Sequence, residues 1–198
     1  MSSQKLRVAV LFGGRSGEHE ISLLSARSIL SAMNADKYEV IQIGITHEGA
    51  WFVGENILDL FAEKGYLNGF ASTALFADPT RRGLYSIHQS DQIEVIELLA
   101  EIDIVFPILH GTFGEDGTIQ GLFELAEIAY VGAGVLGSSL GMDKGVFRDV
   151  MRANNVPQVD TMVVLRSEVE GSLEDVIERA EAMAAYPIFT KPANLGSS

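Results

Sequence analysis

Short apolar runs alternate with segments of helical periodicity through the first two thirds of the chain. Residues 6–12 (LRVAVLF) are mostly apolar and rich in β-branched side chains, which is typical of a strand buried on both faces. Between residues 23 and 33 apolar positions recur at spacings of three and four, which predicts a helix. Residues 38–45 and 102–109 are predicted strands, and a helix is predicted from residue 118. This alternation predicts an α/β fold with an open, mostly parallel, Rossmann-like sheet.

Weaker patterns predict four more elements, at residues 51–53 (an edge strand), 94–100 (a short helix), 158–165 (a strand) and 187–190 (a strand). The character of the sequence changes after residue 132, where a segment of small residues leads into two amphipathic helical patterns. The sequence therefore predicts an N-terminal domain over residues 1–132 and an incomplete α+β domain over residues 133–198.

The composition narrows the classes of partner. Among 198 residues, Lys and Arg total 14 and Asp and Glu total 27, for a formal net charge of −13. Such a surface repels a phosphate backbone and anionic lipid, so we expect neither a nucleic-acid partner nor a membrane partner. The chain has no Cys, which excludes disulfides, thiolate nucleophiles and Cys-based zinc sites. It also has no apolar run of about 18 residues and no signal-peptide pattern, so we expect a cytoplasmic protein.

Two polar loops follow predicted buried strands. Residues 13–20 (GGRSGEHE) come after the first strand and residues 110–117 (HGTFGEDG) come after the strand at 102–109. In open α/β sheets, ligands bind beyond the carboxyl ends of the strands, so both loops are candidates for one site. Glu18 either stabilises a helix start or pairs with a ligand ammonium group. His110 either satisfies local backbone or acts in the site, and its place at a strand end favours function.

Two lysines are candidates for binding an anion. Lys144 follows Asp143 at a predicted helix start, where it would either meet a phosphate or remain solvated. Lys191 ends an apolar stretch, and Gly196-Ser197-Ser198 after it offers N–H groups and hydroxyls without the order of a Walker A loop. The GxGxxG match at residues 132–137 is isolated and lacks a suitably spaced acidic residue, so a linker is favoured there over a dinucleotide site.

Four motifs together carry a family resemblance: LFGGRSGEHEIS, FPILHGTFGEDGTIQG, GMDK and FTKPANLGSS. Their order and approximate spacing resemble those of D-alanine–D-alanine ligases of the ATP-grasp superfamily, from residue 11 to residue 198. The resemblance implies a pre-ATP-grasp domain followed by an incomplete ATP-grasp central domain. It also implies an activity that uses ATP and Mg²⁺. In the reaction that the resemblance implies, ATP phosphorylates one D-alanine on its carboxylate, the amine of a second D-alanine attacks the acyl phosphate, and phosphate leaves to give D-alanyl-D-alanine for peptidoglycan synthesis.

The resemblance implies roles for individual residues. Glu18 would anchor the ammonium group of the first D-alanine, His110 would lie near its carboxylate, and Ser197 would link Glu18 to the active-site loop. Contacts to ATP are implied for Lys144, Lys191 and Ser198. The metal ligands of the family lie beyond Ser198, so we expect none in this chain, and we expect the 198-residue chain alone not to turn over ATP. The family also implies a homodimer formed through the N-terminal domain.

Three alternatives remain open from the sequence. One is another ATP-grasp ligase, such as a D-alanine–D-lactate ligase. Another is a non-catalytic module that binds a nucleotide or an amino acid. The third is a dinucleotide-dependent oxidoreductase that uses residues 132–137.

Overall fold

The computed structural model describes residues 5–63, 67 and 70–196 of the chain. It divides into two compact units, Met1–Ser139 and Leu140–Ser198, with the boundary inside helix α4 (Val135–Met142). The boundary between two domains that the sequence analysis places after residue 132 stays a prediction. Within the described residues, no helix combines the length and apolar character that crossing a bilayer requires.

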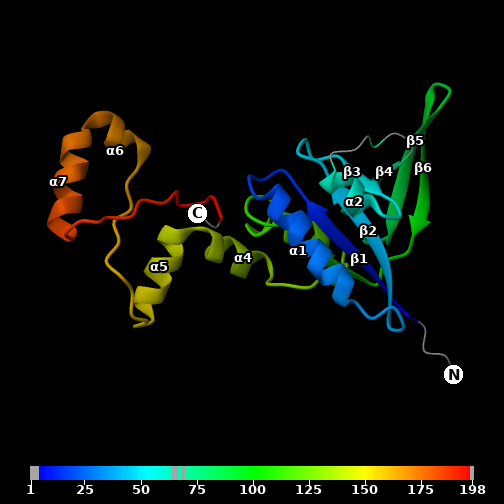
Figure 1. Ribbon diagram of the computed structural model, residues 1–198, viewed down its shortest axis with the longest axis horizontal. Coiled ribbons are helices and arrows are strands. Elements are labelled where there is room, and N and C mark those ends of the chain that lie inside the picture. Colours follow the sequence, from blue (N-terminus) through cyan, green and yellow to red (C-terminus); the bar gives the residue numbers. More distant parts are fainter. Residues whose placement is uncertain (1–4, 64–66, 68–69, 197–198) are drawn as a thin grey trace. The chain divides into compact units, whose positions relative to one another are not determined.

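The first unit is built on a seven-stranded mixed sheet (Figure 1). Its strands are β1 (Leu6–Gly13), β2 (Tyr38–Ile45), β3 (Trp51–Val53), β4 (Ala71–Leu75), β5 (Leu84–Ser90), β6 (Ile93–Ala100) and β7 (Ile104–Pro107). Their order across the sheet is β6-β5-β4-β3-β2-β1-β7. Strand β1 pairs in parallel with both β2 and β7, whereas every pairing from β2 through to β6 is antiparallel.

The α/β class is confirmed, but the prediction of a mostly parallel sheet is wrong. Residues 46–50 join β2 to β3 in a tight turn, in which Thr46 N donates to Ala50 O at 2.9 Å. Residues 91–92 alone join β5 to β6, with Asp91 at a φ of 54°. Connections this short permit only antiparallel pairing, because a parallel crossover needs about a dozen residues or more.

Two predicted elements differ from the structure within this half of the sheet. Residues 94–100 belong to strand β6 and not to a helix, because hairpin pairing with β5 outweighs the helix propensity of their Glu and Leu residues. Residues 51–53 do form a strand, but β3 lies between β2 and β4 and not at an edge.

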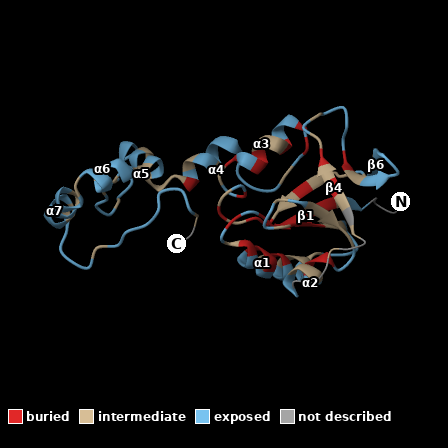
Figure 2. Cartoon of the chain, turned by 90° about the horizontal axis from the view of Figure 1, so that it is seen from above, coloured by how far each residue is buried: buried red, intermediate tan, exposed pale blue. Residues whose placement is uncertain are grey.

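Helices cover both faces of this sheet. Helices α1 (His19–Ala32) and α2 (Ile57–Ala62) lie on one face, and α3 (Thr118–Leu125) lies on the other (Figure 2). Side chains along β1 alternate between the two faces, so this strand contributes to both hydrophobic cores. Val10 packs in the core beneath α1 and α2, and Leu11 packs in the core beneath α3.

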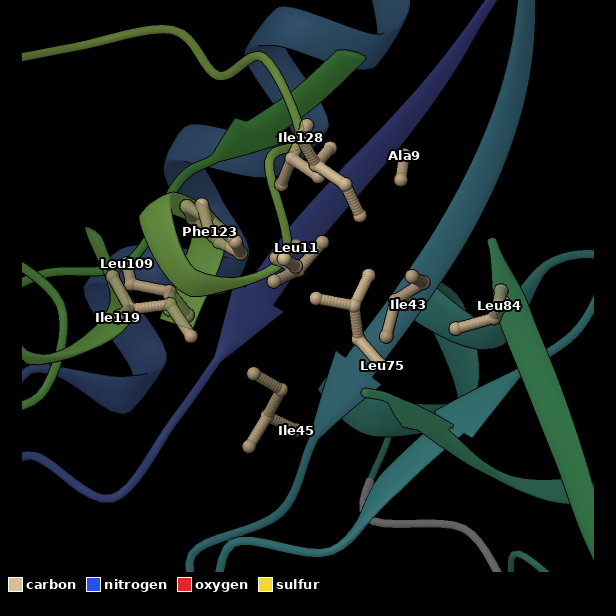
Figure 3. Close-up of a cluster of buried hydrophobic side chains, with 12 residues drawn as sticks. Ala9, Leu11, Ile43, Ile45, Leu75, Leu84, Leu109, Ile119, Phe123 and Ile128 are labelled. Atoms are coloured by element: carbon tan, nitrogen blue, oxygen red, sulfur yellow. The ribbon is translucent and has the colours of Figure 1, made fainter. Parts of the chain in front are cut away.

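The core beneath α3 joins the centre of the sheet to the second polar loop (Figure 3). Leu11 of β1, Ile43 of β2 and Phe123 of α3 are each almost completely buried in it. Burying one such side chain contributes roughly 1.5–3 kcal/mol to stability. Leu109 and Ile119, which flank residues 110–117, belong to the same core, so that loop is anchored at both ends.

The second unit contains α5 (Lys144–Ala153), α6 (Arg166–Gly171) and α7 (Leu173–Met183). Within residues 140–196, which the structure describes, no strand is present, so the strands predicted at 158–165 and 187–190 are wrong. A strand is stable only when a neighbour satisfies its N–H and C=O groups, and neither segment has such a neighbour in the described part of the chain.

An arginine–carboxylate pair fastens the start of β1 to the segment that enters β7. Arg7 donates to Asp103 Oδ2 from its backbone N at 2.8 Å and from Nε at 3.0 Å, and Nη2 donates to Oδ1 at 2.7 Å. The Arg7 side-chain hydrogen bonds lower the pKa of Asp103 from 3.8 to about 2. A carboxylate with a lower pKa in the folded state stabilises the fold above its unfolded pKa, and this contribution is lost as pH falls through the folded pKa.

We predict that Asp103→Asn lowers the thermal unfolding midpoint at pH 7, because the charged pair is lost. The difference from wild type should shrink as the pH falls from about 4 to about 2, where Asp103 becomes protonated in both states. Glu101→Gln is the matched control, since Glu101 also contacts Arg7 but its side chain is 64% exposed, and we expect a small effect. Circular-dichroism melts across this pH range test the prediction, and a pH-independent difference would contradict it.

Candidate functional site

The two polar loops lie side by side at one edge of the sheet, as the strand-end argument predicted. β1 and β7 are adjacent and parallel, so the loops that follow them leave the sheet in the same direction. Ile108 N donates to Leu11 O at 2.8 Å and continues the pairing to the start of the second loop. The loop after β1 is in turn held to β2, because Gly14 N donates to Ile45 O at 2.9 Å.

The Glu18 side chain is directed at the second loop. A Cβ atom added to Gly111 would lie 2.6 Å from Glu18 Oε2, and Gly111 has a φ of +69°. Glycine is therefore required here, both for the backbone conformation and for the approach of the carboxylate. Among the described residues, Glu18 Oε2 is buried without a hydrogen-bond partner. An unpaired buried oxygen is costly, and it is suited to a donor that a ligand brings.

His110 begins the second loop and is held by helix α1. Its Nε2 lies 3.0 Å from Ser25 Oγ. The loop that follows is shaped by its own carboxylates, because Gly111 N donates to Glu115 Oε2 at 2.7 Å and Phe113 N donates to Asp116 Oδ2 at 2.8 Å. Burial by itself would raise the pKa of Asp116, but hydrogen bonds from the backbone N–H groups of Phe113 and Thr118 and from the Thr118 side chain outweigh burial and lower this pKa. The loop is therefore ordered by anionic side chains.

A cavity of about 250 Å³ opens between these loops and the turn after β2. Trp51, Leu109 and Leu122 form part of its apolar wall, and His110 lies among its polar lining. Arg15 also lines it, with its guanidinium 4.9 Å from the centre of the Phe113 ring. Glu18 is not part of this lining, so the carboxylate and the cavity lie at different places along the loops.

Buried polar side chains of α1, which the sequence analysis missed, hold the site together. Ser22 is completely buried, accepts a hydrogen bond from Gly13 N at 2.8 Å and donates to Ile108 O. One hydroxyl therefore ties the end of β1 to the end of β7. His19 is also buried, and its Nδ1 lies 2.8 Å from Gly14 O. Their spacing in the sequence could have indicated this role. Ser22 and Ser25 are three residues apart, so they share one face of a helix.

In the second unit, Lys144 contacts the segment that follows Lys191. Lys144 Nζ donates to Gly196 O at 2.7 Å, and Lys144 N donates to Ala193 O at 3.1 Å. The Asp143 carboxylate accepts hydrogen bonds from two N–H groups in the first turn of α5. The helix N-terminus is therefore satisfied by the chain itself, and the predicted phosphate contact depends on the Lys144 ammonium group. Lys191 is exposed.

Two predicted site residues, Ser197 and Ser198, lie outside the described residues. Within the described residues, no group of three or more His, Asp or Glu side chains has an arrangement that could hold a metal ion.

Comparison with known proteins identifies the family. Residues 7–133 match the family model described as the D-ala D-ala ligase N-terminus. The chain belongs to the D-alanine–D-alanine ligase family. The resemblance drawn from the four sequence motifs is thus confirmed.

Relatives and solved structures agree with this assignment. D-alanine–D-alanine ligases of Natranaerobius thermophilus and Rhodococcus erythropolis are 47% and 44% identical over 196 and 203 residues, covering 98% and 100% of this chain but 52% and 53% of their own length. The structure of the D-alanine–D-alanine ligase from Coxiella burnetii matches with a TM-score of 0.72 and 33% identity over 99% of this chain and 53% of that chain. The VanG D-Ala:D-Ser ligase from Enterococcus faecalis matches with a TM-score of 0.78 and 31% identity over 98% and 54%. The chain spans about half the length of the curated relatives it matches.

We predict that Ser22→Ala destabilises the first unit by about 1–3 kcal/mol, because it leaves Gly13 N and Ile108 O buried without their partner. Urea unfolding followed by tryptophan fluorescence measures the loss. Ser31→Ala is the control, because Ser31 lies on the same helix but makes an exposed bond to Ser28 O. Equal effects of the two substitutions on the free energy of unfolding would contradict the stabilising role of the Ser22 hydroxyl.

Proposed function

We propose that the Glu18 and His110 loops bind the first D-alanine of an ATP-dependent D-alanine–D-alanine ligase. The observation that carries this proposal is the buried Glu18 Oε2, which lacks a hydrogen-bond donor among the described residues and faces Gly111. The ammonium group of an amino acid supplies both the missing donor and the opposite charge. Membership of the ligase family supports the same assignment.

The remaining parts of the site suit a small zwitterion. Glu18 accepts hydrogen bonds from the ammonium group. His110 is adjacent in sequence to Gly111, and the imidazole ring of His110 contacts the amino acid carboxylate. The net charge of −13 disfavours anionic ligands in general, so a carboxylate needs a local donor of this kind. Ser22 and Ser25 keep the two loops in register, so the ammonium and carboxylate partners stay at a fixed separation.

The nucleotide is assigned to the second unit. ATP supplies, when bound, the phosphoryl group that activates the D-alanine carboxylate. The Lys144 ammonium group fits a phosphate, because it has three donors and the Gly196 carbonyl takes one of them. Lys191 and the following Gly196-Ser197-Ser198 segment are assigned to the same phosphates. We assign no Mg²⁺ ligand to the described residues, because they contain no suitable cluster.

The product of this proposal is D-alanyl-D-alanine, a precursor of peptidoglycan, made in the cytoplasm by a homodimer. A second candidate differs only in the second substrate. The match to a D-Ala:D-Ser ligase favours keeping it, because that activity also begins with D-alanine. Both candidates use the Glu18 and His110 loops in the same way, and identifying the dipeptide product distinguishes them.

The first test is D-alanine binding by the 198-residue chain, followed by amide chemical shifts. We predict that Glu18→Gln weakens D-alanine binding about 10- to 100-fold, because a charge-assisted hydrogen bond is lost. ATP affinity should stay unchanged. Glu20→Gln is the matched control, since it removes the same charge from the same helical turn at a side chain that is 60% exposed. Equal losses for both variants, or equal losses for D-alanine and ATP, would count against the role of Glu18.

The reaction itself is tested in a chimaera that joins residues 1–198 to the second half of the Natranaerobius thermophilus relative. We expect the chimaera to form D-alanyl-D-alanine with release of ADP, and Glu18→Gln to raise the KM for D-alanine more than the KM for ATP. A folded chimaera that hydrolyses no ATP in the presence of D-alanine would contradict the proposed function.

A further inference from the structure

Helix α1 contacts both loops of the site through one polar face. Ser22 holds the ends of β1 and β7, and Ser25, three residues later, lies 3.0 Å from His110 Nε2. His110 is 85 residues away in sequence, so this contact exists only because the sheet brings the second loop to the helix. The contact engages Nε2 of the ring, and His110 also lines the cavity between the loops.

The Ser25 hydroxyl differs from other serines of α1 in its hydrogen-bond partner. A serine hydroxyl within a helix commonly donates to a carbonyl one turn earlier. Ser28 donates to Leu24 O at 3.3 Å, and Ser31 donates to Ser28 O at 2.8 Å. Across the described residues, the Ser25 hydroxyl makes its hydrogen bond to His110 Nε2 and not to the helix backbone. Its proton is therefore not taken by a helix carbonyl in the described residues and can be donated to the ring nitrogen.

A ring nitrogen that accepts a hydrogen bond carries no proton. When Ser25 donates to Nε2, the neutral imidazole of His110 must carry its proton on Nδ1. The neutral histidine side chain favours the opposite form, with the proton on Nε2, in water. A hydrogen bond donated by Ser25 would therefore select the less common tautomer, which presents an N–H donor on the side of the ring away from Ser25.

We propose that Ser25 is a positioning residue that holds His110 in the Nδ1–H tautomer, so that the ring donates to a carboxylate at the strand ends. The assignment of a carboxylate as the acceptor rests on the proposed function, in which the D-alanine carboxylate lies near His110. The Nδ1–H group attracts a carboxylate, whereas the lone pair of the other tautomer repels it. The acidic surface of the chain makes such a donor necessary, because the overall field does not attract an anion.

The tautomer is read directly from ¹⁵N chemical shifts in long-range ¹H–¹⁵N spectra of the 198-residue chain with labelled histidine. The spectra are recorded at about pH 8, where an ordinary imidazole is neutral. The chain has 4 His, and His110 is assigned by the signals lost in His110→Gln. We expect a protonated Nδ1 and an unprotonated Nε2 for His110 in the wild-type chain.

Three variants separate positioning from general stability. Ser25→Ala should move the proton of His110 towards Nε2, and Ser25→Thr, which keeps the hydroxyl, should restore the Nδ1–H form. Ser28→Ala is the control on the same helix and should leave the His110 signals unchanged. An Nε2–H tautomer in the wild-type chain overturns the proposal even if Ser25→Ala fails to fold. A folded Ser25→Ala that keeps the Nδ1–H form also overturns it.

These spectra use neither D-alanine nor ATP, so their outcome is independent of the ligase function. A separate experiment adds D-alanine to the wild-type chain and follows the Nδ1 signal of His110. A change in the Nδ1 signal of His110 that is absent with Ser25→Ala supports the link between the tautomer and the carboxylate. An unchanged Nδ1 signal at saturating D-alanine counts against the proposed function and leaves the tautomer assignment standing.

Discussion

The parallel pairing of β1 with β7 is the interaction on which the candidate site depends. It brings together two loops that are nearly a hundred residues apart in sequence, and it sets the register between Leu11 and Pro107 at the strand ends. The Ser22 hydroxyl completes this pairing where the strands stop, because it satisfies one backbone group from each. A slip of one residue would reverse the faces of β1 and place its side chains in the wrong one of the two cores, so the packing of both cores protects the register.

Electrostatics act locally in this protein. The chain as a whole is strongly acidic, yet the features that suit a ligand are single groups: one buried carboxylate oxygen, one imidazole and one ammonium group. The carboxylates of Glu115 and Asp116 accept hydrogen bonds from backbone N–H groups of their own loop, so they shape the site. Charge near the site therefore mainly orders the backbone, and recognition depends on a few groups held by α1 and the sheet.

The sequence was sufficient to predict the parts of the fold that depend on local pattern. Strands β1 and β2, helix α1 and the convergence of the two loops follow from apolar periodicity and from the rule for strand ends. Strand β6 could not be predicted, because its Glu and Leu residues favour a helix and only the hairpin with β5 makes a strand stable. Ser22 and Ser25 were missed for a related reason. A serine on a helix is ordinarily exposed, and the hydrogen-bond partners of Ser22 and Ser25 lie 86 and 85 residues away.

Strand β6 also has a consequence for solubility. One of its sides pairs with β5, while its other side is the outer edge of the sheet, where unpaired N–H and C=O groups could template the addition of another chain. Glu94 and Glu97 are exposed along this strand, so two molecules that approached edge to edge would bring like charges together. Ile93, Ile96, Leu98 and Leu99 of the same strand are also exposed, so these like charges oppose edge-to-edge pairing of a strand that is otherwise apolar.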